Sequence, residues 1–133
     1  MMQGLNVIWV FSPAADKVLM CKRRKDPYKG LYNLVGGKME PGEEGLTAAY
    51  RELREETGIT GIELVHVMDF TYYLDGSCRL EVYAGRLAEH VDVHGDENEL
   101  AWIDVREDFF DMRRFAGEGN IGHIFEIVKQ NRI

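Results

Sequence analysis

Three glutamates, Glu52, Glu55 and Glu56, are the residues whose type and spacing point most directly to chemistry. Residues 43–57 carry apolar side chains at helical spacing, and Gly58 suits a C-terminal cap in the left-handed conformation. On a helix, positions i, i+3 and i+4 share one face, with neighbouring Cβ atoms about 5–6 Å apart. Carboxylate oxygens grouped in this way are the ligands that Mg²⁺ takes in proteins, together with substrate phosphates. Three carboxylates on one helix face can therefore supply the ligands of a divalent cation.

A solvated acidic face is the alternative reading of any such run. Glutamate is a good helix former, and Arg51 and Arg54 can pair with neighbouring acids. The residues around the run distinguish it from an anonymous acidic helix. The segment from Gly37 to Ile59 fits the pattern G-x5-E-x7-R-E-U-x-E-E-x-G-U without a miss, where U is a bulky aliphatic residue. A fixed register over so many positions is far more specific than an isolated acidic pair.

This pattern resembles the Nudix box, and the chain is identified as a member of that family. The resemblance implies that Glu52, Glu55 and Glu56 hold one or more Mg²⁺ ions, with Mn²⁺ as a substitute, and that the Gly37 carbonyl adds a ligand. It also implies that Arg51 orients the glutamates through a salt bridge. A nearby glutamate then takes the proton of the attacking water, and we expect Glu55 to do so.

One more acidic ligand is expected from a loop outside the box. Glu97 and Glu99, just before Trp102, are the candidates, and we place Glu97 first. For each of them, an ordinary solvated loop acid is the alternative. Glu43 is expected to support the loop or a metal-bound water.

The segment LYNLVGGKMEPGE is similar to the corresponding segment of MutT-type enzymes, which hydrolyse oxidised purine nucleoside triphosphates. The resemblance implies that Asn33 and Asn120 contact the base. Tyr32 and Tyr28 flank the approach to the box and are candidates for stacking on the base. The alternatives are a turn asparagine for Asn33, a helix N-cap for Asn120, and ordinary packing for the tyrosines.

The net charge is -7, with 23 acidic and 16 basic residues, so the chain as a whole repels a phosphate backbone. We therefore expect a small-molecule nucleotide as the partner and no nucleic acid. Local basic residues must then meet the substrate phosphates. Arg23, by analogy with MutT-type enzymes, and Lys38 are the candidates. A solvated strand end is the alternative for the basic run 23–25.

These residues together predict a nucleoside triphosphate pyrophosphohydrolase. Its substrate would be a (deoxy)nucleoside triphosphate or 8-oxo-dGTP, cleaved to the monophosphate and pyrophosphate. A pyrophosphatase for ADP-ribose, a nucleotide sugar or a dinucleoside polyphosphate is the alternative. ADP-ribose hydrolases of the family usually carry a proline shortly after the box, whereas this chain has none after Pro41. A nucleotide-sensing module without catalysis is a third possibility.

Apolar and β-branched runs predict strands over residues 5–11, 17–24, 31–35, 62–74, 79–87 and 100–105. Helices are predicted over 43–57 and 121–129. Gly36 and Gly37 are expected to break the third strand, and Asp75-Gly76 to form a turn between the fourth and the fifth. The mixture, like the resemblance, predicts an α/β (α+β) Nudix fold in which a mixed sheet lies between helices.

The length of 133 residues, of which 45% are hydrophobic, predicts a single domain over residues 1–133. No apolar run reaches the roughly 20 residues that span a bilayer, so no membrane partner is expected. The first residues read as a strand and not as a signal peptide, which predicts a cytoplasmic location. Cys21 and Cys78 are expected to be reduced thiols, and neither the cysteines nor the four histidines show metal-ligand spacing. A monomer or homodimer is expected.

Overall fold

The structure is a computed structural model, and it describes residues 3–73, 77–93, 95 and 97–133. Two helices and six strands lie within the described residues. In chain order they are β1 (Gln3–Phe11), β2 (Lys17–Lys22), β3 (Tyr32–Lys38), α1 (Gly45–Thr57), β4 (Val65–Tyr72), β5 (Cys78–Arg86), β6 (Glu99–Asp104) and α2 (Asn120–Gln130). Neither helix has the length and apolar character needed to span a membrane.

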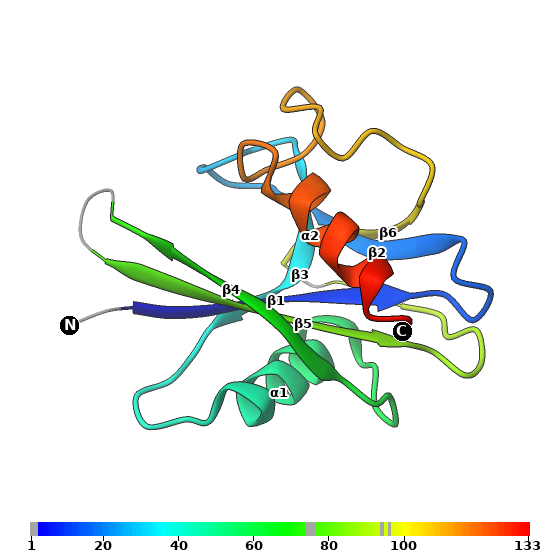
Figure 1. Cartoon of the computed structure of the whole chain (residues 1–133), viewed down its shortest axis with the longest axis horizontal. Helices are drawn as coiled ribbons and strands as arrows, with labels where there is room; N and C mark the ends of the chain where they lie inside the picture. Colours follow the sequence, from blue (N-terminus) through cyan, green and yellow to red (C-terminus); the bar gives the residue numbers. More distant parts are fainter. Residues whose placement is uncertain (1–2, 74–76, 94, 96) are drawn as a thin grey trace.

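The six strands form one mixed sheet in the order β4-β5-β1-β3-β2-β6. β1 pairs with β5 in parallel, and the other long pairings are antiparallel. Figure 1 shows α1 on one side of this sheet and α2 on the other. The predicted fold, a mixed sheet between helices, is therefore confirmed.

Alternation along β1 produces the two layers of the core, because successive side chains of a strand point to opposite faces. Ile8 and Val10 join the cluster that contains Leu53 of α1. Trp9 and Phe11 join the cluster on the α2 side. That second cluster is rich in rings, and Trp9 stacks on Phe125 with centroids 4.7 Å apart.

The expected break of the third strand at Gly36 is wrong. β3 continues to Lys38, and Gly37 lies opposite Asn6 of β1. Gly36 has a φ of 146°, and a Cβ at this position would lie 2.2 Å from the Asn6 backbone oxygen. Glycine is thus needed here for the close approach of two strands and not for a turn.

The remaining differences concern the ends of elements. α1 begins at Gly45, two residues later than expected, because Glu44 has extended backbone angles. The predicted cap is confirmed: Gly58 is left-handed with a φ of 79°, and its N–H donates to the Arg54 carbonyl. β4 begins at Val65, three residues later than expected. The predicted Asp75-Gly76 turn lies outside the described residues.

Candidate active site

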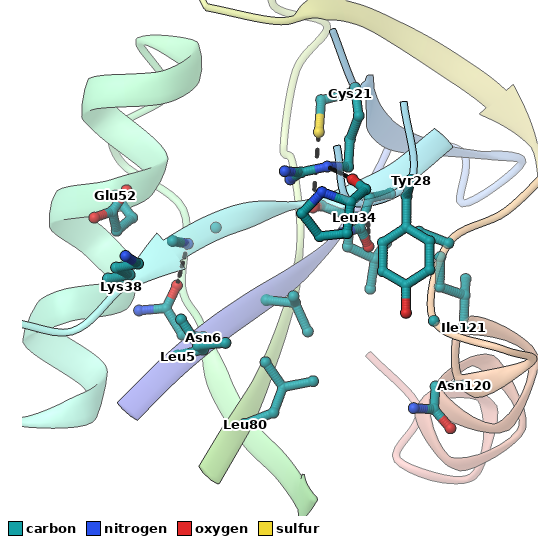
Figure 2. A pocket seen from close by; sticks show the side chains of 18 of the residues that line it. Leu5, Asn6, Cys21, Tyr28, Leu34, Lys38, Glu52, Leu80, Asn120 and Ile121 are labelled. Carbon is teal, nitrogen blue, oxygen red and sulfur yellow. Dashed lines mark hydrogen bonds between the residues drawn. The ribbon is translucent and has the colours of Figure 1, made fainter. Parts of the chain in front are cut away.

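A cavity of about 1490 Å³ collects residues from β1, β3, α1, β5, α2 and the loops beside them. Its size leaves room for a nucleotide, since pockets for small ligands usually measure about 300–1,000 Å³. One part is acidic and lies beside α1, and the other is apolar and lies on the α2 side of the sheet. Figure 2 shows Glu52 of α1 on one side of the cavity and Ile121 of α2 on the other.

The acidic part contains the glutamates predicted to bind metal. Glu52, Glu55, Glu56 and Glu97 all line the cavity, as does the backbone of Gly37. The helix face that carries Glu52, Glu55 and Glu56 and the loop that carries Glu97 thus meet at one cavity. The resemblance implies such an arrangement. Glu99 is absent from the lining and belongs to β6, where it lies opposite Lys22.

Glu56 is half-buried, as is Glu52, whereas Glu55 and Glu97 are exposed. Its Oε2 accepts the Gly36 N–H at 2.9 Å. Burial raises the pKa of Glu56 from 4.5 to about 7, and the negative charges of Glu52 and Glu97 add to the rise, whereas the Gly36 N–H opposes it. In the absence of a cation, the protein therefore holds this carboxyl group partly protonated near neutral pH. A cation at the cluster would reverse that preference, because metal ligands must be deprotonated.

Arg51 ties the acidic residues together. Its Nε and Nη2 donate to the two carboxylate oxygens of Glu43 at 2.7 and 2.8 Å. Its Nη1 donates to Glu52 at 2.9 Å and to Glu55 at 3.0 Å. The Arg51 guanidinium lowers the pKa of Glu43 to about 2, helped by the Glu40 N–H. A planar fork of donors suits this arrangement, because one side chain can hold three carboxylates at fixed angles.

The residues around Gly37 fit a bound cation. A Cβ at Gly37 would lie 2.5 Å from Glu52 Oε2, so glycine is what lets this carboxylate reach the strand. The Gly37 N–H donates to Asn6 Oδ1 at 3.2 Å. Asn6 is only 1% exposed, and its Nδ2 has no partner among the described residues. A donor set made only of oxygen matches Mg²⁺, and the orphaned amide could be satisfied by an oxygen ligand of such an ion.

The second part of the cavity is lined by aliphatic side chains. Leu5 and Val7 of β1, Leu80 of β5, and Ile121 and Ile124 of α2 form its wall. Flat apolar walls with a few polar groups at their edge are typical of sites for aromatic ligands. The apolar residues of the cavity thus lie on the α2 side and the acidic ones beside α1.

The residues predicted to bind substrate are not all at the cavity. Arg23, Asn33, Lys38 and Asn120 line it. Tyr32 does not: its ring packs against Phe115, with centroids 6.4 Å apart. The stacking expected of Tyr32 therefore has no geometric support.

The details of the lining residues differ from expectation in two places. Asn120 is the first residue of α2, and Gly119 occupies the N-cap position, so the N-cap alternative for Asn120 is wrong. Its Nδ2 donates instead to the Tyr72 hydroxyl. Arg23 is half-buried, and its Nε donates to the Pro27 carbonyl at 2.7 Å, which leaves its Nη groups without a hydrogen bond to the described residues.

Asn6, Tyr72 and Glu118 line the cavity, although sequence reasoning assigned them no part in it. Asn6 is the one polar residue in the predicted strand 5–11, and that break in an apolar run was the signal in the sequence; its pairing with Gly37 is visible only in the structure. Cys21, expected to be a buried thiol, is buried and free and also touches the cavity. Burial and the Glu56 carboxylate raise its pKa to about 12, which keeps this thiol protonated at neutral pH.

A second acidic group lies away from the cavity. His66, Asp69 and Glu81 bring ligand atoms within 4.8 Å of one another. Arg79 donates to Asp69 at 2.8 Å, and Tyr83 donates to Glu81 at 2.6 Å. A neighbouring cation and hydroxyl therefore already satisfy these carboxylates, and we assign the group no role.

Comparison with known proteins agrees with this geometry. A model of the NUDIX domain family matches residues 2–121. The chain belongs to the NUDIX domain family. A solved structure of a MutT protein from Methanosarcina mazei Go1 has the same fold as this Nudix chain, with a TM-score of 0.78 at 19% identity over 99% of this chain and 96% of that one. The predicted family is confirmed.

Curated relatives of this Nudix chain carry different activities. An ADP-ribose pyrophosphatase of Methanocaldococcus jannaschii is 46% identical over 44 residues, which are 33% of this chain and 26% of that protein. An 8-oxo-dGDP phosphatase of Mus musculus is 42% identical over 53 residues, which are 40% of this chain and 16% of that protein. The chain thus covers well under two thirds of the length of either relative.

Proposed function

We propose that this Nudix protein hydrolyses a phosphoanhydride bond of a nucleoside triphosphate, with (deoxy)NTP or 8-oxo-dGTP as substrate and the monophosphate and pyrophosphate as products. The observation that carries the proposal is the two-part cavity. Its acidic part lies beside a helix whose Glu52, Glu55 and Glu56 share one face, and its apolar part has polar residues at its edge, as a site for a purine requires.

Glu52, Glu56 and Glu97, with the Gly37 carbonyl, would hold Mg²⁺ or Mn²⁺ in the acidic part. Such an ion supplies charge neutralisation on the phosphates and lowers the pKa of a bound water. The protein has too few free basic groups here to neutralise a triphosphate by itself, because Arg51 is committed to three carboxylates. A cation is therefore the component that reconciles a polyphosphate substrate with a chain of charge -7.

The protein's own residues would do the positioning and the proton transfer. Glu55 is our candidate for the general base, because its side chain is 55% exposed and reaches the cavity with one oxygen held by Arg51. Arg23 and Lys38 would contact phosphate oxygens between the two parts. Asn33 and Asn120 would contact the base, whose ring lies against the apolar wall.

Hydrolysis of ADP-ribose is the second candidate. It is favoured by the similarity to the Methanocaldococcus jannaschii ADP-ribose pyrophosphatase. The same acidic part would act on the diphosphate of ADP-ribose, so the metal site does not distinguish the two functions. Only the apolar part and its polar edge can do so.

A substrate panel with Mg²⁺ tests the proposal. The protein is incubated with the four NTPs, 8-oxo-dGTP, ADP-ribose, a nucleotide sugar and a dinucleoside polyphosphate, and the released phosphates are identified. We expect pyrophosphate from at least one triphosphate, and none from Glu52→Gln or in the presence of EDTA. Turnover of ADP-ribose without turnover of any triphosphate would establish the second candidate instead.

A further inference from the structure

We propose that Glu118 is a specificity-determining residue that selects a guanine base, together with the Tyr72 hydroxyl and the Asn120 side chain. The inference rests on the proposed function, because it places a nucleotide base in the apolar part of the cavity. It goes further by naming the residue that reads the base and the edge of the base that is read.

Glu118 is held at the edge of the cavity by a contact between two loops. It lies between Gly117 and Gly119, directly before α2, and it lines the cavity. The Tyr28 hydroxyl donates to its carboxylate, 2.7 Å from each of the two oxygens. The two residues are 90 positions apart in the chain, so this bond joins two separate loops. Figure 2 shows the Tyr28 ring directed toward the start of α2, where Asn120 and Ile121 lie.

The backbone conformations of Glu118 and Tyr28 are also unusual. Its φ is 52° and that of Tyr28 is 68°, so both residues adopt the left-handed conformation, which is uncommon outside glycine. The neighbouring chain is anchored, because the Tyr32 N–H donates to the Arg114 carbonyl at 2.8 Å and the Ala116 N–H donates to the Tyr32 carbonyl at 2.9 Å. Glu118 is exposed, and its carboxylate is oriented by the loop backbone and by the Tyr28 hydroxyl.

The polar groups at this edge of the cavity have hydrogen-bonding capacity that the described residues leave unused. An ionised carboxylate only accepts, at about four lone-pair sites, and Tyr28 supplies a single hydrogen to Glu118. The Tyr72 hydroxyl accepts from Asn120 Nδ2, so its own hydrogen has no acceptor among the described residues. Asn120 Oδ1 likewise has no donor among them. Asn120 Nδ2 uses one of its two hydrogens on Tyr72 and keeps the other. This edge of the cavity therefore offers acceptors at Glu118 and Asn120 Oδ1, and donors at the Tyr72 hydroxyl and Asn120 Nδ2.

Guanine fits these donors and acceptors better than the other purine bases do. Guanine presents two adjacent donors, N2–H and N1–H, which the Glu118 carboxylate can accept. They are followed by the acceptor O6, which the Tyr72 hydroxyl or Asn120 Nδ2 can meet. Hypoxanthine lacks the N2 donor. Adenine presents an acceptor at N1, which would face the Glu118 carboxylate and leave it unpaired or repelled. The 8-oxo modification leaves the N1, N2 and O6 edge of guanine unchanged, so the same residues would accept oxidised and normal guanine.

Kinetics with three purine triphosphates test this inference. We would measure kcat/KM with Mg²⁺ for GTP, ITP and ATP in the wild type, Glu118→Gln and Tyr28→Phe. The wild type should prefer GTP over both others. Glu118→Gln should lower kcat/KM for GTP by about 10- to 100-fold, as expected for hydrogen bonds to a charged group, and should change it little for ATP. Tyr28→Phe should lower the value for GTP by a smaller factor, because the carboxylate stays but loses its anchor.

Glu107→Gln is the matched control. Glu107 lies in the same connection before α2, is paired with Arg114 at 2.6 Å, and does not line the cavity. It should keep the GTP-to-ATP ratio of the wild type. An unchanged ratio in Glu118→Gln, or a wild type that prefers ATP, would overturn the inference.

Binding of products separates this inference from the proposed function. Calorimetric titration with GMP, IMP and AMP reports the base preference even if no triphosphate is hydrolysed. Tighter binding of GMP, lost in Glu118→Gln, would support the role of Glu118 although the hydrolysis proposal had failed. Equal affinity for the three monophosphates would overturn the inference although hydrolysis had been observed.

Discussion

Replacing Glu56 by glutamine should stabilise the metal-free protein while abolishing its activity. The Glu56 carboxyl is buried, and its pKa rises from 4.5 to about 7 in the folded protein. Between these two pH values the unfolded chain has lost a proton that the folded chain retains. Stability of the metal-free wild type therefore falls as the pH rises from about 4.5 to about 7, and the loss is complete above that range.

The size of the effect follows from the two pKa values. At 1.36 kcal/mol for each tenfold change in proton affinity, the difference between 4.5 and about 7 corresponds to about 3 kcal/mol above pH 8. Glutamine cannot ionise, and its carbonyl oxygen can still accept the Gly36 N–H. Glu56→Gln should therefore be more stable than the wild type by up to about 3 kcal/mol at pH 8, or by roughly 10 °C in Tm for a domain of this size. At pH 5 the difference should shrink to below about 1 kcal/mol.

Urea or thermal unfolding in EDTA at pH 5 and pH 8 measures this difference. Glu55→Gln is the control, because Glu55 is 55% exposed and its replacement should change the free energy of unfolding by less than about 1 kcal/mol at both pH values. Adding Mg²⁺ should stabilise the wild type at pH 8 and have little effect on Glu56→Gln. If Glu56→Gln in EDTA were no more stable than the wild type at pH 8, ionised Glu56 would not lower the free energy of unfolding, and the prediction would be wrong.

Three further predictions concern the same acidic part. Gly37→Ala should keep the fold by circular dichroism but weaken Mn²⁺ binding by at least about 10-fold in an EPR titration, because the new Cβ would lie 2.5 Å from Glu52 Oε2. Arg51→Lys should lower kcat by about 10- to 100-fold in steady-state assays, since lysine cannot hold three carboxylates at once; wild-type turnover would contradict this. Glu52→Gln should remove turnover with Mg²⁺ or Mn²⁺ without lowering Tm in EDTA, and activity within threefold of the wild type would refute its role as a ligand.

The acidic helix was determined by the sequence itself. The signals for this helix lie within a few residues of one another. Glu52, Glu55 and Glu56 share a face because of helical periodicity. Gly58 ends the helix because a left-handed residue is needed there. The alternation along β1 likewise determined which side chains enter each layer of the core. Patterns of this kind depend on neighbours within a few positions, so a single sequence suffices to recognise them.

The polar edge of the cavity was decided only by the tertiary structure. Tyr28 meets Glu118 across 90 positions, and Asn120 meets Tyr72 across 48. Loop conformation and strand order determine such contacts, and neither leaves a periodic signal in the chain. The same reason explains why Tyr28 and not Tyr32 lines the cavity: the two lie four residues apart, but the second is in β3 and packs against Phe115. Local periodicity therefore grouped three of the predicted metal ligands on one helix face, whereas long-range packing decided which polar side chains meet at the other edge of the cavity.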